Sequence, residues 1–322
     1  MRAAIVLWTI ALVLPLQSPP LGLDLYRPAP ASNPTTSRKA ALGRALLFDA
    51  RLSGDGTVSC ATCHVPSRAF TDGRAVAVGT GGRRGRRNTP TLVNRVYGRA
   101  FFWDGRAASL ESQVREPMLN PREMGGTAEL VIRVVREDLE YRRGFADAFG
   151  RPAEFDDVAS AIATYVRTIQ SGDSRLDRYR HGDASALTPL ELRGMRLFYG
   201  TAQCGSCHAG PTFSDERFHN TGVAYRDGQW QDEGRFAVSG QDRDLGAFKT
   251  PTLREVHRTA PYMHDGSLAT LEDVIEFYDR GGRSNPQLDS VVRPIGLEPV
   301  EKQALAAFLR VLSGQITEVH RR

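Results

Sequence analysis

Apolar residues recur at helical spacing in several stretches of this chain. Ser37–Asp49 places alanine and leucine at intervals of one, three and four residues, which predicts a helix over that range. A helix is also expected from Pro189 to Gly200, because Thr188 and Glu191 stand at the N-cap and third positions of a capping box. Its inward face is predicted to carry Leu190, Leu197 and Phe198.

Three further stretches show the same periodicity. Asp156 is a candidate cap for a helix that runs to Gly172, and Pro299 begins an amphipathic helix that ends at Ser313. A helix after the N-cap Thr270 places four side chains on one face, namely Leu271, Val274, Ile275 and Tyr278. Alternating strand patterns are scarce, so the sequence predicts a mainly α fold with long loops.

The N-terminal residues are typical of an export signal. Arg2 supplies the positive charge, and Ala3–Leu16 is a nearly unbroken apolar stretch that is too short to span a bilayer comfortably. We therefore predict a signal peptide over residues 1–17, a linker over 18–36 and a periplasmic location. The nearby Ala-x-Ala pattern, Ala29–Ala31, lies far beyond the apolar stretch. The cleavage site therefore stays open, and an uncleaved membrane anchor remains an alternative.

The composition is that of a globular protein with ample material for its cores. Of the residues, 41% are hydrophobic and 25% charged, so the chain does not depend on disulfides for stability. The formal net charge is +5, but the basic residues are scattered, and the densest group, Arg83–Arg87, lies in a glycine-rich loop. We therefore expect no nucleic-acid binding. The excess of arginine is better suited to pairing with the carboxylates of a buried cofactor.

All four cysteines fall into one motif that occurs twice. Cys60–His64 and Cys204–His208 both read C-x-x-C-H, the attachment signature of c-type haem. The spacing suits that chemistry, because two thiols on one helical turn can add to the two vinyl groups of haem. The histidine that follows is then placed to ligate the iron. The sequence therefore predicts two covalently bound haems, held through Cys60, Cys63, Cys204 and Cys207, with His64 and His208 as iron ligands.

Three other uses of these cysteines fit the pattern less well. Structural zinc ligands come as separated knuckles without a fixed C-x-x-C-H unit. A redox C-x-x-C pair is expected in a βαβ context, which is not visible in this sequence. Disulfides are permitted outside the cytoplasm, but the two motifs already use every cysteine.

The two motifs start 144 residues apart, so each is expected to anchor a domain of its own. A predicted helix and a short loop precede each motif, which indicates an internal repeat in the architecture. We predict an N-terminal haem domain over residues 37–180 and a C-terminal haem domain over 181–322, with the boundary near 172–187. The expected fold class is mainly α, with two c-type cytochrome-like domains.

Segments around and between the motifs resemble bacterial dihaem cytochrome c peroxidases and their MauG-type relatives. The resemblance covers the chain from about residue 37 to residue 312. The matching segments are Arg44–Ser53 (RALLFDARLS), Phe70–Gly73 (FTDG), Arg87–Thr91 (RNTPT), Phe102–Arg106 (FWDGR) and Ala260–Gly266 (APYMHDG). Two haems alone specify electron transfer, whereas this family adds peroxide chemistry at the N-terminal haem.

The resemblance implies that the haem held by His64 is the peroxidatic one. Family members that need reductive activation carry a blocking histidine sixteen residues after this ligand, and this chain has Thr80 there. We therefore expect an open sixth position at the first haem. The distal pocket maps onto Gln113, Pro117 and Glu123. Glu123 is the candidate acid–base group, because cleavage of peroxide requires a proton to be taken up and returned.

Two more roles follow from the same resemblance. Trp103 matches the family tryptophan between the haems, where an indole can shorten electron hopping, although packing as a core aromatic is compatible with that position. Tyr278 stands fourteen residues after His264, where typical dihaem peroxidases have a methionine ligand of the second haem and MauG-type enzymes have tyrosine. A hard tyrosinate favours ferric or higher iron, whereas a soft methionine favours ferrous iron. Met263 is the rival ligand.

The resemblance also implies a calcium ion between the domains and two kinds of partner. Asn88 matches the family's calcium ligand, and the backbone carbonyls of Thr259 and Pro261 would add further oxygens, which suit Ca²⁺. The expected partners are hydrogen peroxide and a small electron-donor protein of the cytochrome c or cupredoxin type. A homodimer is implied by the family alone.

The predicted reaction is the reduction of hydrogen peroxide to water at the first haem, with electrons delivered through the second. Two alternatives remain open. One is a MauG-type enzyme that uses peroxide to oxidise residues of a partner protein, which Thr80 and Tyr278 favour. The other is a non-catalytic dihaem electron-transfer cytochrome, against which Glu123 and an open first haem argue.

Overall fold

Short helices and long loops alternate along the chain in the computed structural model, which describes residues 19–23 and 29–318. The α-helices are α1 (Ser37–Leu47), α2 (Cys60–Cys63), α3 (Leu110–Leu119), α4 (Ala128–Glu137), α5 (Leu139–Phe149), α6 (Phe155–Thr168), α7 (Arg175–Arg180), α8 (Pro189–Tyr199), α9 (Phe236–Ser239), α10 (Leu271–Asp279) and α11 (Pro299–Arg310). The strands are β1 (Gln170–Gly172), β2 (Phe218–His219), β3 (Tyr225–Arg226), β4 (Gln229–Trp230), β5 (Phe248–Lys249) and β6 (Gln315–Thr317). The prediction of a mainly helical fold is confirmed.

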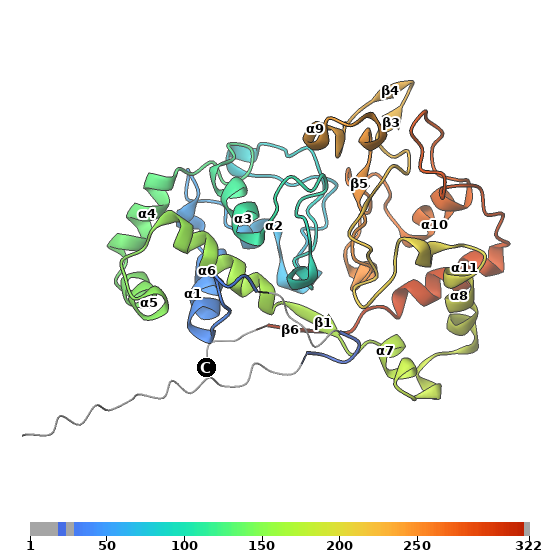
Figure 1. Ribbon diagram of the computed structural model, residues 1–322, viewed down its shortest axis with the longest axis horizontal. Helices are drawn as coiled ribbons and strands as arrows, with labels where there is room; N and C mark the ends of the chain where they lie inside the picture. Colours follow the sequence, from blue (N-terminus) through green and yellow to red (C-terminus); the bar gives the residue numbers. More distant parts are fainter. Residues whose placement is uncertain (1–18, 24–28, 319–322) are drawn as a thin grey trace, which may run out of the picture.

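Buried apolar side chains form two clusters. The first draws on residues from Leu42 to Ile169, and the second on residues from Leu176 to Leu312. The helices of the first cluster, α1 and α3–α6, lie on the left of Figure 1, and α8, α10 and α11 lie on the right. Below the junction β1 pairs antiparallel with β6, so the end of the chain returns to the segment that follows α6.

A glycine permits the closest helix contact in each half. α1 crosses α6 at Gly43, where an added Cβ atom would lie 1.9 Å from the carbonyl oxygen of Ala161. α8 meets α11 in the same way, because a Cβ atom at Gly194 would lie 2.0 Å from the oxygen of Ala304. Both crossings therefore exclude any larger side chain. Each brings the helix that precedes a C-x-x-C-H motif against the longest helix of its half.

The helix starts predicted at Thr188 and Thr270 are confirmed. The Thr188 side chain accepts a hydrogen bond from the backbone N–H of Glu191 and completes the capping box of α8, and Thr270 does the same with Asp273 at the start of α10. α1 and α11 begin as predicted but end two and three residues earlier, at Leu47 and at position 310.

Three details of the helix predictions are wrong. α6 begins after Glu154, whose side chain forms a capping box with Asp157, so Asp156 lies inside the first turn. The helix stops at Thr168, because the next residues extend into β1 to pair with the C-terminal strand. Leu190 does not face inward: it lies in the first turn of α8 and is 43% exposed.

The predicted signal peptide lies outside the described residues, whereas part of the predicted linker lies against the folded chain. The carbonyl of Leu21 accepts a hydrogen bond of 2.9 Å from the backbone N–H of Asp173. The buried guanidinium of Arg254 donates to the carbonyl of Gly22 at 3.0 Å, and Asn33 is also buried. Among the residues that the structure describes, no helix is long and apolar enough to cross a membrane.

Candidate functional site

A cavity of about 1330 Å³ is lined by residues of both halves. This volume exceeds the roughly 300–1,000 Å³ of ordinary small-molecule pockets, as two large cofactors would require. Every residue that the sequence predicts for the site lines it. These residues are Cys60, Cys63, His64, Asn88, Trp103, Gln113, Pro117, Glu123, Cys204, Cys207, His208, Thr259, Pro261, Met263 and Tyr278.

The first C-x-x-C-H motif forms one helical turn, α2, and ends in a fixed histidine. Nδ1 of His64 lies 3.0 Å from the carbonyl oxygen of Phe70, so a proton on Nδ1 leaves Nε2 as the free ring nitrogen. Histidines that bind a metal commonly donate their other N–H to a backbone carbonyl in this way. Burial lowers the pKa of His64, which favours the neutral imidazole that a metal needs.

The second motif repeats this geometry on a 3₁₀ turn at Cys204–Ser206. Nδ1 of His208 lies 2.9 Å from the carbonyl oxygen of Phe213, and burial lowers the pKa of this histidine too. Both histidines therefore offer Nε2 as a ligand.

The four thiols are free, as thioether attachment to haem requires. None forms a disulfide. Burial raises the pKa of Cys60 to about 12, that of Cys63 to about 11 and that of Cys204 to about 12. A redox-active C-x-x-C pair requires a lowered thiol pKa, so this geometry argues against the redox alternative.

The cavity wall also carries two buried positive charges that share a single negative charge. Arg95 and Lys249 line the cavity and share one buried carboxylate, that of Glu216, at 3.1 and 3.4 Å. Burial lowers the pKa of Lys249 to about 7, so one shared carboxylate does not fully offset the cost of burying this ammonium group. An anionic group in the cavity would complete the cluster, and haem propionates carry that charge. The residues present therefore fit haem.

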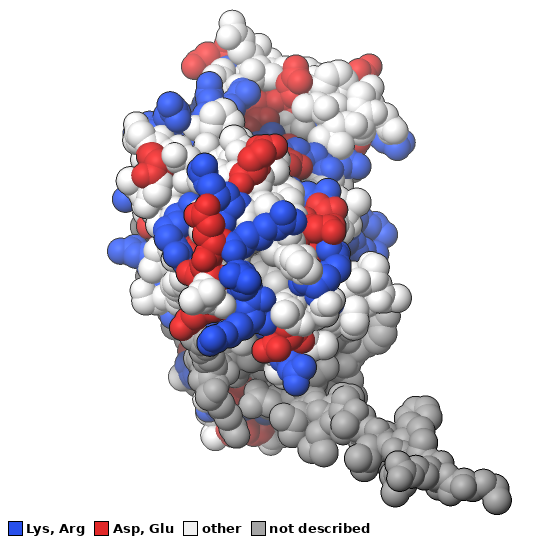
Figure 2. Space-filling model, turned by 90° about the vertical axis from the view of Figure 1, so that its left-hand side faces the viewer, with Lys and Arg blue, Asp and Glu red and all other residues white. Residues whose placement is uncertain are grey.

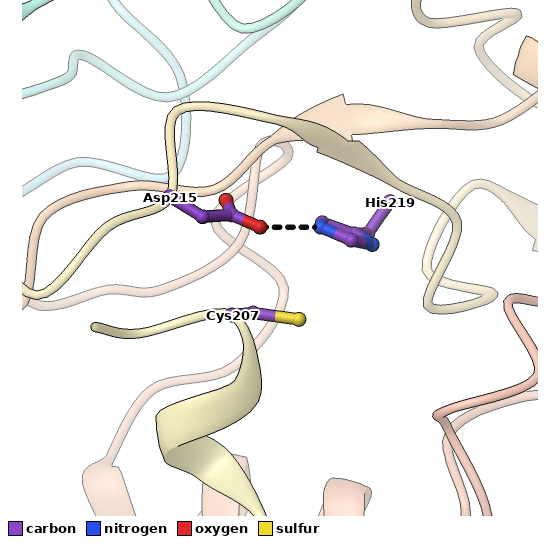
Figure 3. A group of neighbouring side chains, drawn as sticks. All are labelled: Cys207, Asp215 and His219. Carbon is purple, nitrogen blue, oxygen red and sulfur yellow. Dashed lines mark hydrogen bonds and ion pairs between the residues drawn. The ribbon is translucent and has the colours of Figure 1, made fainter.

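One cluster beside the second motif has the composition of a metal site. Cys207 Sγ, a carboxylate oxygen of Asp215 and a ring nitrogen of His219 lie within 4.8 Å of one another (Figure 3). However, both ring nitrogens of His219 are engaged, with Asp215 at 3.0 Å and with Asp289 at 2.6 Å. Cys207 is also the second thiol of a haem motif. Once that thiol is used, the cluster is better described as a histidine held between two carboxylates.

The predicted distal residues gather at the end of α3. Gln113 and Pro117 lie on this helix, and Glu123 lies in the turn that follows it. Burial raises the pKa of Glu123, and its charge contributes to the raised pKa of the thiols of Cys60 and Cys63. A carboxyl group with a raised pKa beside the first haem motif is suited to taking up and releasing a proton.

The glycine-rich loop that carries Thr80 packs directly on the Glu123 segment. Thr80 is buried, and its backbone N–H donates to the carbonyl of Glu123 at 2.8 Å. A Cβ atom at Gly79 would lie 2.3 Å from the carbonyl oxygens of both Arg122 and Glu123. The loop is therefore seated where only glycine fits.

Trp103 lies at the junction of the two halves and forms a hydrogen bond with a residue of each half. Its indole Nε1 donates to the carbonyl of Asn88 at 2.9 Å, and its own carbonyl accepts from the N–H of Lys249 at 2.8 Å. The N–H of Asn88 in turn donates to the carbonyl of His264 at 2.7 Å. Trp103 is thus fixed where the two halves meet.

The two rival ligands of the second haem both reach the cavity. Burial raises the pKa of Tyr278, and the nearby thiols of Cys204 and Cys207 contribute to the shift. Met263 lines the same cavity and has a φ of 72°. Both side chains therefore line the cavity, Tyr278 lies near the thiols of the second motif, and the choice of ligand stays a prediction.

The residues predicted to bind calcium also come together at the cavity. The Nδ2 group of Asn88 donates to the carbonyl of Arg74 at 2.8 Å, so Oδ1 is the atom of this side chain that is suited to a cation. Thr259 and Pro261 line the same cavity.

One polar residue of this site was missed by the sequence reasoning. Asn120 lines the cavity, and its Nδ2 group donates to Oε1 of Glu123 at 2.8 Å. An asparagine at the end of a helix is typical of a turn, so the sequence carried no sign that its side chain meets the predicted acid–base group.

Two C-x-x-C-H turns with matching histidine geometry on one cavity define a dihaem c-type cytochrome. Comparison with known proteins then specifies the family. Residues 37–185 match the model of the di-haem cytochrome c peroxidase family. The methylamine utilization protein MauG of Methylorubrum extorquens is 42% identical over 89% of this chain and 82% of its own length. The cytochrome-c peroxidase IdrP1 of Denitromonas iodatirespirans is 37% identical over 92% of this chain and 86% of its own.

A solved structure shows the same architecture. The crystal structure of a MauG-like protein associated with microbial copper homeostasis superposes with a TM-score of 0.84 at 36% identity, and the match covers 96% of both chains. The chain belongs to the dihaem cytochrome c peroxidase and MauG family. It is a dihaem peroxidase with haem c as its cofactor, and its partners are peroxide and either a redox protein or a protein substrate.

Proposed function

We propose that His64 holds the peroxidatic haem, that this haem is open on its distal side, and that Glu123 moves the proton there. The observation that carries the proposal is the half-buried Glu123 carboxyl on the cavity wall beside the first motif, with Thr80 at the position of the blocking histidine. The bound haem supplies the iron at which peroxide is reduced.

The side chains around Glu123 suit the handling of peroxide. Glu123 takes the proton from the near oxygen and returns it to the leaving oxygen, which departs as water. Gln113 offers an amide to orient the peroxide, and Pro117 closes the apolar side of the pocket. Trp103, held where the two halves meet, would shorten the electron route from a second haem, which His208 and Tyr278 would hold. A small soluble redox protein in the periplasm supplies the electrons.

The proposal includes two haem domains, over residues 37–180 and 181–322, related by an internal repeat. Thr89–Leu92 and Thr250–Leu253 both read TPTL, which supports the repeat in sequence. The two histidine-to-carbonyl contacts, the two glycine crossings and the reciprocal bonds around Trp103 support it in structure. A calcium ion on Asn88, between the two domains, completes the proposed site.

The electronic spectrum of the purified ferric protein tests this proposal most directly. We expect optical and EPR spectra of one high-spin and one low-spin haem, because the first haem lacks a distal protein ligand. Stoichiometric hydrogen peroxide should then change the optical spectrum rapidly, without prior reduction. Two low-spin haems that do not respond to peroxide would leave an electron-transfer cytochrome.

A second candidate function is the oxidation of residues on a partner protein. Tyr278 and the 42% identity to a methylamine utilization protein MauG favour it. The two functions predict different turnover. Fast peroxide consumption with reduced cytochrome c or cupredoxin donors supports the peroxidase. Slow consumption with every such donor, together with peroxide-driven oxidation of a co-isolated protein, supports the second.

The seating of the glycine-rich loop gives a prediction about Gly79. The substitution Gly79→Ala should push the Glu123 backbone away and slow the peroxide reaction about a hundredfold, because displacements near 1 Å have effects of that size. Stopped-flow absorbance of the ferric protein with peroxide measures this rate. Gly85→Ala is the matched control in the same loop, since its added Cβ would lie no closer than 3.5 Å to any neighbour. Equal rates for the two variants would contradict a loop that positions Glu123.

A further inference from the structure

The turn between α3 and α4 is closed by the backbone of Asn120. Its N–H donates to the carbonyl of Glu116 at 2.8 Å and ends α3. Its carbonyl accepts from the N–H groups of Glu123 and Gly125, both at 2.9 Å. Asn120 therefore holds the Glu123 backbone on the side of α3.

The side chain of Asn120 has its orientation fixed at both ends. Its Oδ1 atom accepts from the backbone N–H of Arg122 at 3.0 Å, and only an oxygen can fill that role. Nδ2 must then be the atom that donates to Oε1 of Glu123 at 2.8 Å. Within the residues that the structure describes, no hydrogen bond reaches Oε2, the second oxygen of this carboxyl group.

The Glu123 segment is also held from its other side. The N–H of Thr80 donates to the Glu123 carbonyl, and Gly79 lies against the backbone of residues 122–123. The chain therefore cannot retreat from the cavity, and the conformation of the carboxyl group depends on its one hydrogen-bond donor.

We propose that Asn120 is a positioning residue that holds one oxygen of the Glu123 carboxylate and leaves the other free to accept the proton of peroxide. The proposal rests on the function proposed for Glu123. A donor to a carboxylate stabilises the ionised form over the protonated one. Asn120 thus offsets the effect of burial and keeps Glu123 available as a base.

Several other charged groups face this carboxyl group. The charge of Arg106, from the loop after Trp103, lowers the pKa of Glu123, and that of Glu116 on α3 raises it, but burial is the largest cause and the bond from Asn120 the next. Arg122 lines the same cavity. The sulfur atoms of Cys60 and Cys63 carry no charge once they form thioether bonds with haem.

The test is the rate at which the ferric holoprotein reacts with hydrogen peroxide, measured as a function of pH. The rate should fall on the acidic side as Glu123 takes up a proton. Asn120→Ala removes the donor and should move this acidic limb upward by about one pH unit or more. Asn120→Asp keeps the acceptor for Arg122 but places a second carboxylate beside Glu123, and should move the limb further.

Controls separate this inference from the function on which it rests. Haem content and thermal midpoint verify folding, and Asn285→Asp adds the same charge in the other half without moving the limb. Normal rates in Glu123→Gln would overturn the proposed function itself. Slow reaction in Glu123→Gln, with the acidic limb of Asn120→Asp at its original pH, would overturn only the role of Asn120. A lower plateau with an unmoved limb would also overturn it, since that is a merely structural effect.

Discussion

Replacing Glu123 by glutamine is expected to slow the reaction of the ferric protein with hydrogen peroxide by about 10²- to 10⁴-fold, the usual contribution of a positioned acid–base group. Glutamine keeps the shape of the side chain and can still contact Asn120, but it cannot carry the proton. Both haems should remain attached, because neither C-x-x-C-H motif is changed. Stopped-flow absorbance under pseudo-first-order peroxide measures the rate.

The matched control for this prediction is Glu129→Gln. Glu129 lies in the first turn of α4, six residues further along the chain, and its carboxylate is fully exposed. This variant removes the same charge and should react at the wild-type rate. If Glu123→Gln also reacted at that rate, a solvent molecule or another side chain would have to move the proton.

The acidic side of the same reaction identifies the group that titrates. Burial raises the pKa of Glu123 above its ordinary value, so protonated Glu123 accumulates at a higher pH than an exposed glutamate would allow. A base must be deprotonated to act, so the rate falls as pH falls through this raised pKa. In Glu123→Gln the acidic limb itself should disappear.

The features that the sequence predicted well are local ones. Each C-x-x-C-H motif fits within one turn, and the capping boxes of α8 and α10 join residues three apart. Such patterns depend on neighbours in the chain and need no knowledge of the tertiary fold. The motifs themselves gave the haem-attachment residues, and family resemblance gave the other site residues. The fold brings all of them to one cavity.

The features that the sequence did not reveal depend on contacts between distant segments. α6 stops at Thr168 because Gln170–Gly172 pairs with β6, nearly 150 residues later. The close contact of Gly79 with residues 122–123 and the hydrogen bond between Gly22 and Arg254 are of the same kind. Asn120 was missed for another reason. The sequence is consistent with a turn at this asparagine, but it carries no sign of the side-chain hydrogen bond to Glu123.

The surface gives less information than the cavity. Lysine and arginine are interspersed with aspartate and glutamate on the face shown in Figure 2, and no region of a single sign marks a docking surface there. The electron donor must therefore be identified by experiment. The ligand of the second haem sets the midpoint potential of the haem that such a donor would reduce.

Replacing Tyr278 by methionine is expected to raise the midpoint potential of the second haem by roughly 0.3 V, a large share of the range of about 0.8 V that axial ligands span. A tyrosinate stabilises ferric iron and a thioether stabilises ferrous iron, so the variant should hold an electron at potentials where the wild type is oxidised. Spectropotentiometric titration of both haems measures the change. The first haem should shift far less, because its own ligand, His64, is untouched.

A pair of further variants separates Tyr278 from its rival. If Tyr278 is the ligand, Tyr278→Phe should convert the second haem to a high-spin spectrum, and Met263→Leu should leave it low-spin. If Met263 is the ligand, the opposite pattern follows, and Tyr278→Met should leave the potential nearly unchanged. A thioether ligand would also stabilise the ferrous state of the second haem, so that this haem could hold an electron for the first. The MauG-type function would then lose the support that it draws from Tyr278, and the peroxidase would be the stronger of the two candidates.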